Sequence, residues 1–271
     1  MPRLPVSPRR FGLFGCVLAV ALGARCEVPR SEALHPTTST GAAPTANAAD
    51  AAPVPSTAPV ASTDKPDAVA PRRAYAVAAL GDSLTDFRSH GGGYLRYLKE
   101  RCPESRFDSY GKGGDMVNQM RRRFGKDLLG RPDLAYDHLV VFGGVNDLYS
   151  DLTALRTVPK IEADLVAIYA AARERGMKVV AVTVTPWGGF SRYYTEARGR
   201  TTLELNRWIM ERRGAGVVDF AVDAYPLLSC GSPELLCDRL AEPFHDGLHF
   251  GPEGHKKLGA ALFDAVFSDC R

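Results

Sequence analysis

The sequence predicts an α/β domain in which helices cover both faces of a parallel β-sheet. Short apolar, β-rich runs alternate with longer amphipathic stretches along the second part of the chain, as in parallel sheets with crossover helices. Glycine and polar residues follow nearly every apolar run, where turns are needed. The segment that shows this alternation is about 200 residues long, which is enough for one domain with a single core.

Five apolar runs are the expected strands, and they cover residues 75–80, 106–110, 138–142, 178–183 and 216–220. The stretches between and after them predict five helices at residues 94–101, 116–129, 159–175, 201–213 and 252–267. The clearest helix is 159–175, because apolar residues recur at helical spacing at Ile161, Leu165, Ile168 and Ala172. In such folds the ligand binds beyond the carboxyl ends of the strands.

The N-terminal 73 residues are predicted to lie outside this domain, which spans residues 74–271. Residues 1–26 are read as a signal peptide, because a basic start precedes an apolar run of about 14 residues, too short for a comfortable membrane span. Cys26 ends this segment, and two alternatives stay open. Either Cys26 is lipidated and anchors the protein to a membrane, or the signal is simply cleaved near Gly23 or Ala24. Arg25, directly before Cys26, departs from the lipoprotein pattern. Residues 27–73 are rich in Ala, Pro, Thr and Ser and predict a disordered tether. We therefore expect a secreted or cell-envelope protein.

The charge and the cysteine content of the domain indicate which partners, crosslinks and metal sites to expect. From residue 71 onward the chain carries a net charge of +2 and no basic stripe, so nucleic acid is not an expected partner. Four cysteines in an exported domain suggest disulfides, with Cys230 paired to Cys237 and Cys102 then left for Cys270. No C-x-x-C or H-E-x-x-H pattern occurs, so we expect neither a metal site nor a cofactor. We expect a monomer.

Two short stretches, 166 residues apart, contain the residue types of nucleophilic catalysis. Ser83 follows the first predicted strand, and Asp246-Gly247-Leu248-His249 places a carboxylate and an imidazole on one turn. A serine hydroxyl needs a base to take its proton, and the base needs a partner that fixes its tautomer. Taken alone, Ser83 has an alternative interpretation as a helix N-cap, and the Asp–His turn has one as a surface turn. Their occurrence together, after predicted strands, favours a catalytic site.

The motifs resemble those of the SGNH hydrolases, the GDSL-type esterases and lipases. Gly81-Asp82-Ser83-Leu84 matches the first block of that family, Gly144-Val145-Asn146-Asp147 the third and Asp246-Gly247-Leu248-His249 the last. The second block departs from the family pattern, because Ser109 stands where an asparagine is usual before Gly114. The resemblance covers residues 75–268 and implies a flavodoxin-like three-layer α/β/α sandwich with a five-stranded parallel sheet.

The resemblance also implies a role for each matching residue. Ser83 would be the nucleophile, His249 the base and Asp246 its orienting partner. The backbone N–H groups of Ser83 and Gly114 and the side-chain amide of Asn146 would form the oxyanion hole. A rival reading of Gly144-Val145-Asn146-Asp147 is a tight turn in which Asn146 has no chemical role.

The expected function is that of an exported serine esterase. It would hydrolyse carboxylic esters through an acyl-enzyme, on small-molecule or polymer-linked substrates such as acylated carbohydrate or lipid-type esters. An acyltransferase to sugar hydroxyls and a catalytically silent carbohydrate-binding envelope protein are the alternatives. The α/β-hydrolases share the order Ser…Asp…His, but they need a G-x-S-x-G elbow, which the sequence around Ser83 lacks.

Other residues near these motifs have less specific interpretations. The aromatic residues after the fourth strand either line an acyl or sugar site or cover the edge of the core, and these are Trp187, Phe190, Tyr193 and Tyr194. His90, beside three glycines, belongs either to a mobile lip or to a plain flexible loop. His255 is expected on the surface of the last helix, and Arg121, Arg122 and Arg123 are expected to be partly solvated.

Overall fold

The computed structural model describes residues 73–131 and 133–270, which all belong to one compact unit, Lys65–Arg271. The predicted signal peptide with Cys26 and nearly all of the predicted tether lie outside the described residues, so those predictions stay untested. No described helix is both long and apolar enough to cross a membrane.

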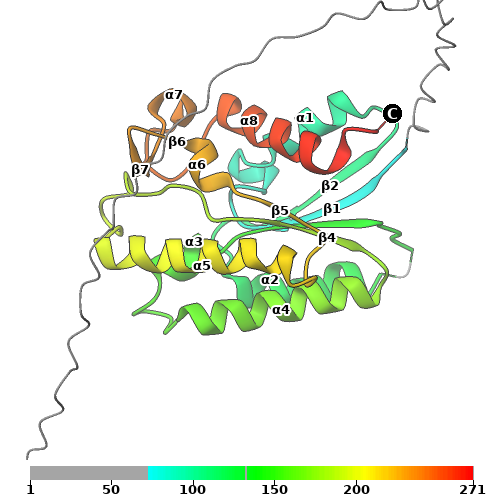
Figure 1. The fold of residues 1–271 in the computed structure, drawn as a ribbon, viewed down its shortest axis with the longest axis horizontal. Helices are drawn as coiled ribbons and strands as arrows, with labels where there is room; N and C mark the ends of the chain where they lie inside the picture. Colours follow the sequence, from blue (N-terminus) through cyan, green and yellow to red (C-terminus); the bar gives the residue numbers. More distant parts are fainter. Residues whose placement is uncertain (1–72, 132, 271) are drawn as a thin grey trace, which may run out of the picture. The chain divides into compact units, whose positions relative to one another are not determined.

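A five-stranded parallel sheet forms the centre of the domain, as predicted (Figure 1). Its strands are β1 (Ala76–Gly81), β2 (Arg106–Gly111), β3 (His138–Phe142), β4 (Lys178–Val182) and β5 (Phe220–Val222), in the order β2-β1-β3-β4-β5. Each strand pairs in parallel with its neighbours, so all carboxyl ends lie at one edge.

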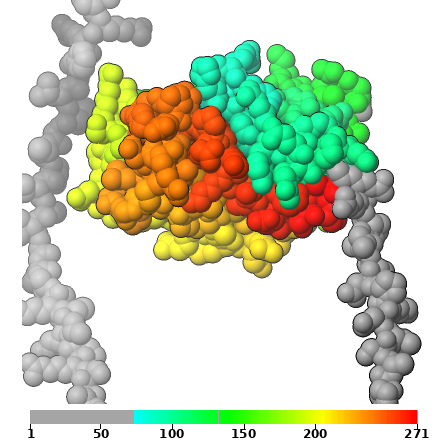
Figure 2. Space-filling view, turned by 90° about the horizontal axis from the view of Figure 1, so that it is seen from above, coloured from blue at the N-terminus to red at the C-terminus, as the bar shows by residue number. Residues whose placement is uncertain are grey.

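Both faces of the sheet are buried, because successive side chains of a strand point to opposite faces. Val77 and Ala79 of β1 belong to one core cluster, and Ala78 and Leu80 belong to the other. The first face is covered by α1 (Gly93–Arg101), α6 (Ala224–Leu228) and α8 (Pro252–Leu262), and the opposite face by α2 (Val117–Arg123), α4 (Val158–Glu174) and α5 (Glu196–Gly214) (Figure 1). Figure 2 shows α8, in red-orange, against the turquoise segment that includes α1.

The helix boundaries differ from the prediction in several places. The predicted helices 116–129 and 252–267 are α2 and α8, each continued by a π-helical turn, at Phe124–Leu129 and Phe263–Phe267. Helix α5 begins earlier than predicted, at Glu196, because the Thr195 side chain accepts from the N–H of Arg198 and caps it. Short elements that were not predicted are a 3₁₀ turn at Phe87–Ser89, α3 (Val145–Tyr149), α6, α7 (Asp238–Ala241) and a hairpin of β6 (Ser229–Cys230) and β7 (Ser232–Leu236).

The predicted position of the fifth strand, 216–220, is wrong, because β5 covers Phe220–Val222. The residues before it complete the end of α5 instead. The N–H groups of Val217 and Val218 both donate to the carbonyl of Arg212, and Gly216 adopts a positive φ of 69°. A helix cap of this kind uses the backbone N–H groups of residues whose apolar side chains alone would suggest a strand.

Both predicted disulfide pairs are present. Cys102, directly after α1, pairs with Cys270 at a Cα–Cα distance of 5.3 Å, which joins α1 to the C-terminal end of the domain. Cys230 pairs with Cys237 at 4.8 Å and closes the β6–β7 hairpin. The pairing therefore confirms the prediction from the even cysteine count.

Candidate active site

The loops at the carboxyl ends of the strands bring the predicted site residues together. Ser83 lies two residues beyond β1, Gly114 lies in the loop after β2, and Asn146 is in α3, directly after β3. The turn Asp246–His249 comes just before α8. A parallel sheet places all of these segments at one edge, which is the physical reason that residues so far apart in sequence meet.

Ser83, His249 and Asp246 form a continuous hydrogen-bonded chain. The Oγ of Ser83 lies 2.9 Å from Nε2 of His249, and Nδ1 of His249 lies 2.6 Å from Oδ2 of Asp246. With its Nδ1–H donated to the carboxylate, the imidazole presents an unprotonated Nε2 to the serine hydroxyl. The His249 and Asp246 side chains are 28% and 39% exposed, so a substrate can reach them from solvent.

The Asp246–His249 turn is held by its own backbone. Oδ1 of Asp246 accepts from the N–H groups of Leu248 at 2.9 Å and His249 at 2.8 Å, which leaves Oδ2 for the imidazole. Burial opposes the charge on Asp246, but the hydrogen bonds from the His249 ring and from these two N–H groups lower its pKa below the usual value. Gly247 has φ +78°, and a Cβ there would lie 2.0 Å from the carbonyl carbon of Gly189. Only glycine fits this position without displacing the chain.

Asp82 builds the turn that presents Ser83. Its carboxylate accepts from the N–H of Leu84 at 3.0 Å, and its carbonyl accepts from the N–H groups of Thr85 and Asp86. The Asp82 side chain is completely buried, and burial raises its pKa to about 7. Ser83 caps no helix: the helical turn that follows is capped by Asp86, whose side chain accepts from the N–H of Arg88.

The candidate oxyanion donors differ in their surroundings. Neither Ser83 nor Gly114 donates its backbone N–H to another described residue, and Gly114 has φ +79° with no atom within 4 Å of an added Cβ. The amide of Asn146 is 4% exposed and has partners already. Its Nδ2 donates to the carbonyl of Asp115 at 2.9 Å and to Oδ2 of Asp82 at 3.3 Å. The longer contact is the weaker one, so an oxyanion would share or replace the hydrogen now aimed at Asp82.

Several residues that support this arrangement were not identified from the sequence. Tyr149 donates its hydroxyl to Oδ1 of Asn146 at 2.7 Å and so fixes which side of the amide carries the hydrogens. Asp147, completely buried, accepts from the N–H of Val117 at 2.8 Å and from Arg156 at 2.6 Å. Ser109, at the position where the family pattern has asparagine, donates to the carbonyl of Thr85 at 2.6 Å. Nothing in the sequence pattern pairs these residues.

The arginine run is partly solvated, as expected: Arg121 and Arg122 are exposed, and Arg123 is the most buried of the three. Its side chain is 18% exposed, and Nε lies 2.6 Å from Oδ2 of Asp115. Its other nitrogens donate to the carbonyls of Tyr110 and Gly81, at the ends of β2 and β1. Arg123 therefore joins two strand ends to the residue whose carbonyl holds the Asn146 amide.

The aromatic residues after β4 mainly cover the edge of the core. Trp187 is completely buried, and its Nε1 donates to Oγ1 of Thr202 at 3.0 Å, so it offers no free ring face to a ligand. Phe190 and Tyr193 are partly buried and stack around Tyr149, with ring centroids 6.0 and 5.3 Å away. Their rings thus pack against the tyrosine whose hydroxyl contacts Asn146.

The expectation that His255 lies on the helix surface is wrong, because the residue is 3% exposed. Its ring lies between Phe250, at a centroid distance of 4.4 Å, and Tyr94, at 6.1 Å. Burial, with a further contribution from Arg96, lowers the pKa of His255 to about 4. Among the described residues no group of three or more His, Cys, Asp and Glu side chains could hold a metal ion.

Comparison with known proteins identifies the family and the fold of the chain. Residues 79–257 match the model of the GDSL-like Lipase/Acylhydrolase family. A search of curated proteins found no match. Among solved structures, a GDSL-like lipase from Bacteroides thetaiotaomicron is 20% identical, with a TM-score of 0.57 over 70% of this chain and 86% of that one.

Two further solved structures share the fold. A catalytic mutant of an acetylxylan esterase from Geobacillus stearothermophilus is 18% identical, with a TM-score of 0.57 over 74% of this chain and 98% of that one. A lipase/acylhydrolase from Enterococcus faecalis is 21% identical, with a TM-score of 0.56 over 73% and 97%.

Proposed function

The chain belongs to the GDSL-like Lipase/Acylhydrolase family, and from that membership we propose that Ser83, His249 and Asp246 are the catalytic triad of this carboxylic ester hydrolase. The observation that carries the proposal is the unbroken path of hydrogen bonds from the Ser83 hydroxyl through both imidazole nitrogens to the Asp246 carboxylate. The distances of 2.9 and 2.6 Å are within the range that proton transfer requires.

The acylation step follows from this path. Oγ of Ser83 attacks the ester carbonyl carbon while its proton passes to Nε2 of His249, and the imidazolium that forms is stabilised by Asp246. The tetrahedral intermediate then collapses, the bond to the alcohol oxygen breaks, and His249 returns the proton to that oxygen. Water attacks the acyl-enzyme in the same way and releases the acid and the free serine.

Negative charge develops on the former carbonyl oxygen in each tetrahedral intermediate. The N–H groups of Ser83 and Gly114 have no protein acceptor among the described residues and are therefore free to donate to that oxygen. Asn146 supplies a third donor if the amide hydrogen now directed at Oδ2 of Asp82 is shared with the oxyanion. Tyr149 and Asp115 hold the amide at both ends, so Asn146 does not have to reorient during the reaction.

We assign acylated carbohydrate as the preferred substrate class, with lipid-type esters as the second. The partly exposed Asp246 and His249 side chains suit an ester on a bulky chain better than one that must be enclosed. Acetylxylan esterases among the structures of the same fold support the assignment.

Export is proposed on independent grounds. All four cysteines of the domain are paired, which fits an oxidising compartment, and the N-terminal sequence is typical of a signal peptide. Thiol counting on the unreduced, denatured mature domain should find almost no free thiol. Four free thiols would reject the pairing and the compartment together.

The triad is tested with Ser83→Ala. The variant should lose p-nitrophenyl acetate hydrolysis and labelling by a fluorophosphonate probe, because Ser83 is the only described serine in hydrogen-bond contact with His249. The circular dichroism and thermal midpoint of the variant should match those of the wild type. Substantial turnover by the folded variant would remove Ser83 from the mechanism. Wild-type protein that neither turns over esters nor takes the probe would instead be a silent carbohydrate-binding protein.

Transfer to a sugar hydroxyl is separated from hydrolysis by the acceptor. We expect the acyl group of a p-nitrophenyl ester to appear as free acid even when a polyol is present in excess. Recovery of most of the acyl group as the polyol ester would make the protein a transferase that uses the same triad.

A further inference from the structure

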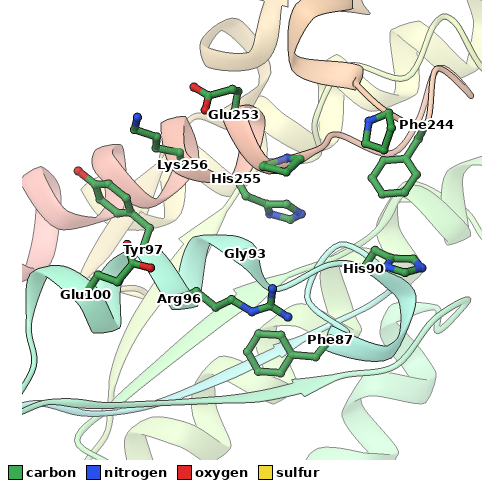
Figure 3. Close-up of a pocket in the computed structure, with 12 residues that line it drawn as sticks. Phe87, His90, Gly93, Arg96, Tyr97, Glu100, Phe244, Glu253, His255 and Lys256 are labelled. Carbon is green, nitrogen blue, oxygen red and sulfur yellow. The ribbon is translucent and has the colours of Figure 1, made fainter.

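A cavity of about 800 Å³ lies between α1 and α8, beside the triad but not lined by it (Figure 3). Its volume falls in the range of small-molecule sites, about 300–1,000 Å³. One ring contact connects the cavity to the triad, and a second lies within its wall. Phe244, in its wall, has its ring centroid 6.4 Å from that of His249 and 5.9 Å from that of His90. Phe244 therefore brings the wall of the cavity next to the His249 ring.

The end of the cavity nearest the triad combines aromatic and basic groups. Arg96 extends from α1 toward Phe87 and His90, and its guanidinium lies 5.1 Å from the centroid of the Phe87 ring (Figure 3). Arg96 forms no ion pair with another described residue. The carboxylates in the wall, Glu100 and Glu253, lie toward the other end (Figure 3). An unpaired, always-charged guanidinium beside an exposed ring thus faces a space large enough for a ligand.

His255 adds a second, independent observation. Its ring projects from α8 toward the cavity (Figure 3) although the residue is 3% exposed. Its Nδ1 is buried and has no hydrogen-bond partner among the described residues. A buried polar atom without a partner costs free energy. Because Nδ1 is shielded from solvent, a ligand in the cavity would contact the other ring nitrogen, Nε2. The low pKa of His255 keeps the imidazole neutral at pH 7, which gives it one donor and one acceptor nitrogen.

We propose that this cavity binds the part of the substrate beyond the scissile ester and selects a saccharide that carries a carboxylate. Arg96 pairs with the carboxylate, Phe87 and Phe244 pack against sugar rings, and His255 exchanges hydrogen bonds with hydroxyls. The proposal rests on the proposed esterase function and specifies its substrate class. A lipid chain fits less well, because the wall contains four charged side chains, Arg96, Glu100, Glu253 and Lys256, which a hydrocarbon would desolvate.

The test compares three acetyl esters. Two are acetylated xylo-oligosaccharides of equal length and acetyl content, one neutral and one bearing a glucuronosyl group, and the third is p-nitrophenyl acetate, which is too small to reach the cavity. The wild type should have a kcat/KM about tenfold higher for the acidic oligosaccharide than for the neutral one. Arg96→Met should lower kcat/KM for the acidic oligosaccharide by roughly 10- to 100-fold, as expected when a charge-assisted hydrogen bond is lost. It should leave the other two substrates within about twofold.

Two control variants separate charge selection from a general effect. Arg88→Met removes a nearby arginine, in the 3₁₀ turn before α1, whose side chain is 86% exposed and does not line the cavity, and it should change nothing. Glu253→Gln removes a carboxylate from the wall and should leave the acidic substrate unaffected or improve it. Calorimetry with Ser83→Ala protein and the glucuronosylated, deacetylated oligosaccharide measures binding without turnover, and Arg96→Met in that background should weaken it to the same extent.

Three results would overturn the inference. The first is an equal wild-type kcat/KM for the acidic and neutral oligosaccharides. The second is an equal loss of kcat/KM on all three esters in Arg96→Met. The third is a wild type that hydrolyses p-nitrophenyl acetate but neither of the two oligosaccharides. Failure of the esterase function itself looks different, because then no ester is hydrolysed and the fluorophosphonate probe does not label Ser83.

Discussion

Replacing Asn146 with alanine separates a catalytic role from a structural one, because the amide has three polar contacts besides any to substrate. Its Nδ2 donates to Asp115 and Asp82, and its Oδ1 accepts from Tyr149. Loss of an oxyanion donor lowers kcat by roughly 10²–10³, which corresponds to about 2.7–4 kcal/mol. KM should change little, because the bond to the oxyanion strengthens mainly in the transition state.

The same substitution should also destabilise the domain. It leaves a buried Asp82 oxygen and the Tyr149 hydroxyl without a partner, and each loss costs about 1–3 kcal/mol. Tyr149→Phe provides the matched control, because it removes the contact to Oδ1 and leaves the amide hydrogens in place. We expect Tyr149→Phe to lower kcat by less than tenfold and to cost about 1 kcal/mol of stability.

The assay measures kcat and KM on p-nitrophenyl acetate and urea unfolding on the same preparation of each protein. Circular dichroism at the assay temperature gives the folded fraction, to which kcat is normalised. A destabilised Asn146→Ala variant with wild-type kcat would refute the catalytic role. Asn146 would then only hold the turn after β3, and the N–H groups of Ser83 and Gly114 would be the remaining donors.

Three further predictions concern pH and backbone geometry. The kcat/KM for p-nitrophenyl acetate should rise with pH as His249 loses its proton, while Asp246, with its lowered pKa, stays ionised; a flat profile with chemistry rate-limiting would contradict the role of His249 as base. Asp82 keeps its proton to about pH 7 in the folded protein but ionises near 3.8 in the unfolded chain. The unfolding free energy of the wild type, measured relative to that of Asp82→Asn, should therefore fall by up to about 4 kcal/mol between pH 4 and 7. Urea titrations that give parallel curves of unfolding free energy against pH for the two proteins would exclude this effect. Gly247→Ala should cost about 1–3 kcal/mol and lower kcat, because the Cβ meets the Gly189 carbonyl carbon, whereas Gly214→Ala, with open space around it, should be neutral in thermal melts and kinetics.

The sequence signals that single out the candidate site residues are local. Each motif is a few residues long and follows an apolar run whose periodicity identifies a strand or helix. The parallel connection of those strands then requires the loops of Ser83, Asn146 and His249 to meet at one edge. The disulfide pairing could be predicted for a similar reason. Cys230 and Cys237 are close enough in sequence to close a short loop, and the remaining two cysteines then form the other pair.

The helix and strand boundaries that were predicted wrongly are those at which two neighbouring elements compete for the same residues. The apolar residues before β5 have the composition of a strand, but their N–H groups serve the end of α5 instead. Helix α5 begins at Glu196 because the Thr195 side chain caps it there, a contact that apolar periodicity does not register. Propensity and periodicity describe a segment alone and cannot rank such alternatives.

The sequence by itself determined the order of layers, the Gly–Asp–Ser–Leu turn and the Asp–Gly–Leu–His turn, because these depend on residues that are neighbours in the chain. Only the tertiary structure decided the depth of Asp82, the three contacts of the Asn146 amide, and the burial of His255 beside an unpaired Arg96. Each of these depends on which side chains from distant segments fill the same space. That is settled by close packing and by the need to pair buried polar groups, and no local pattern encodes it.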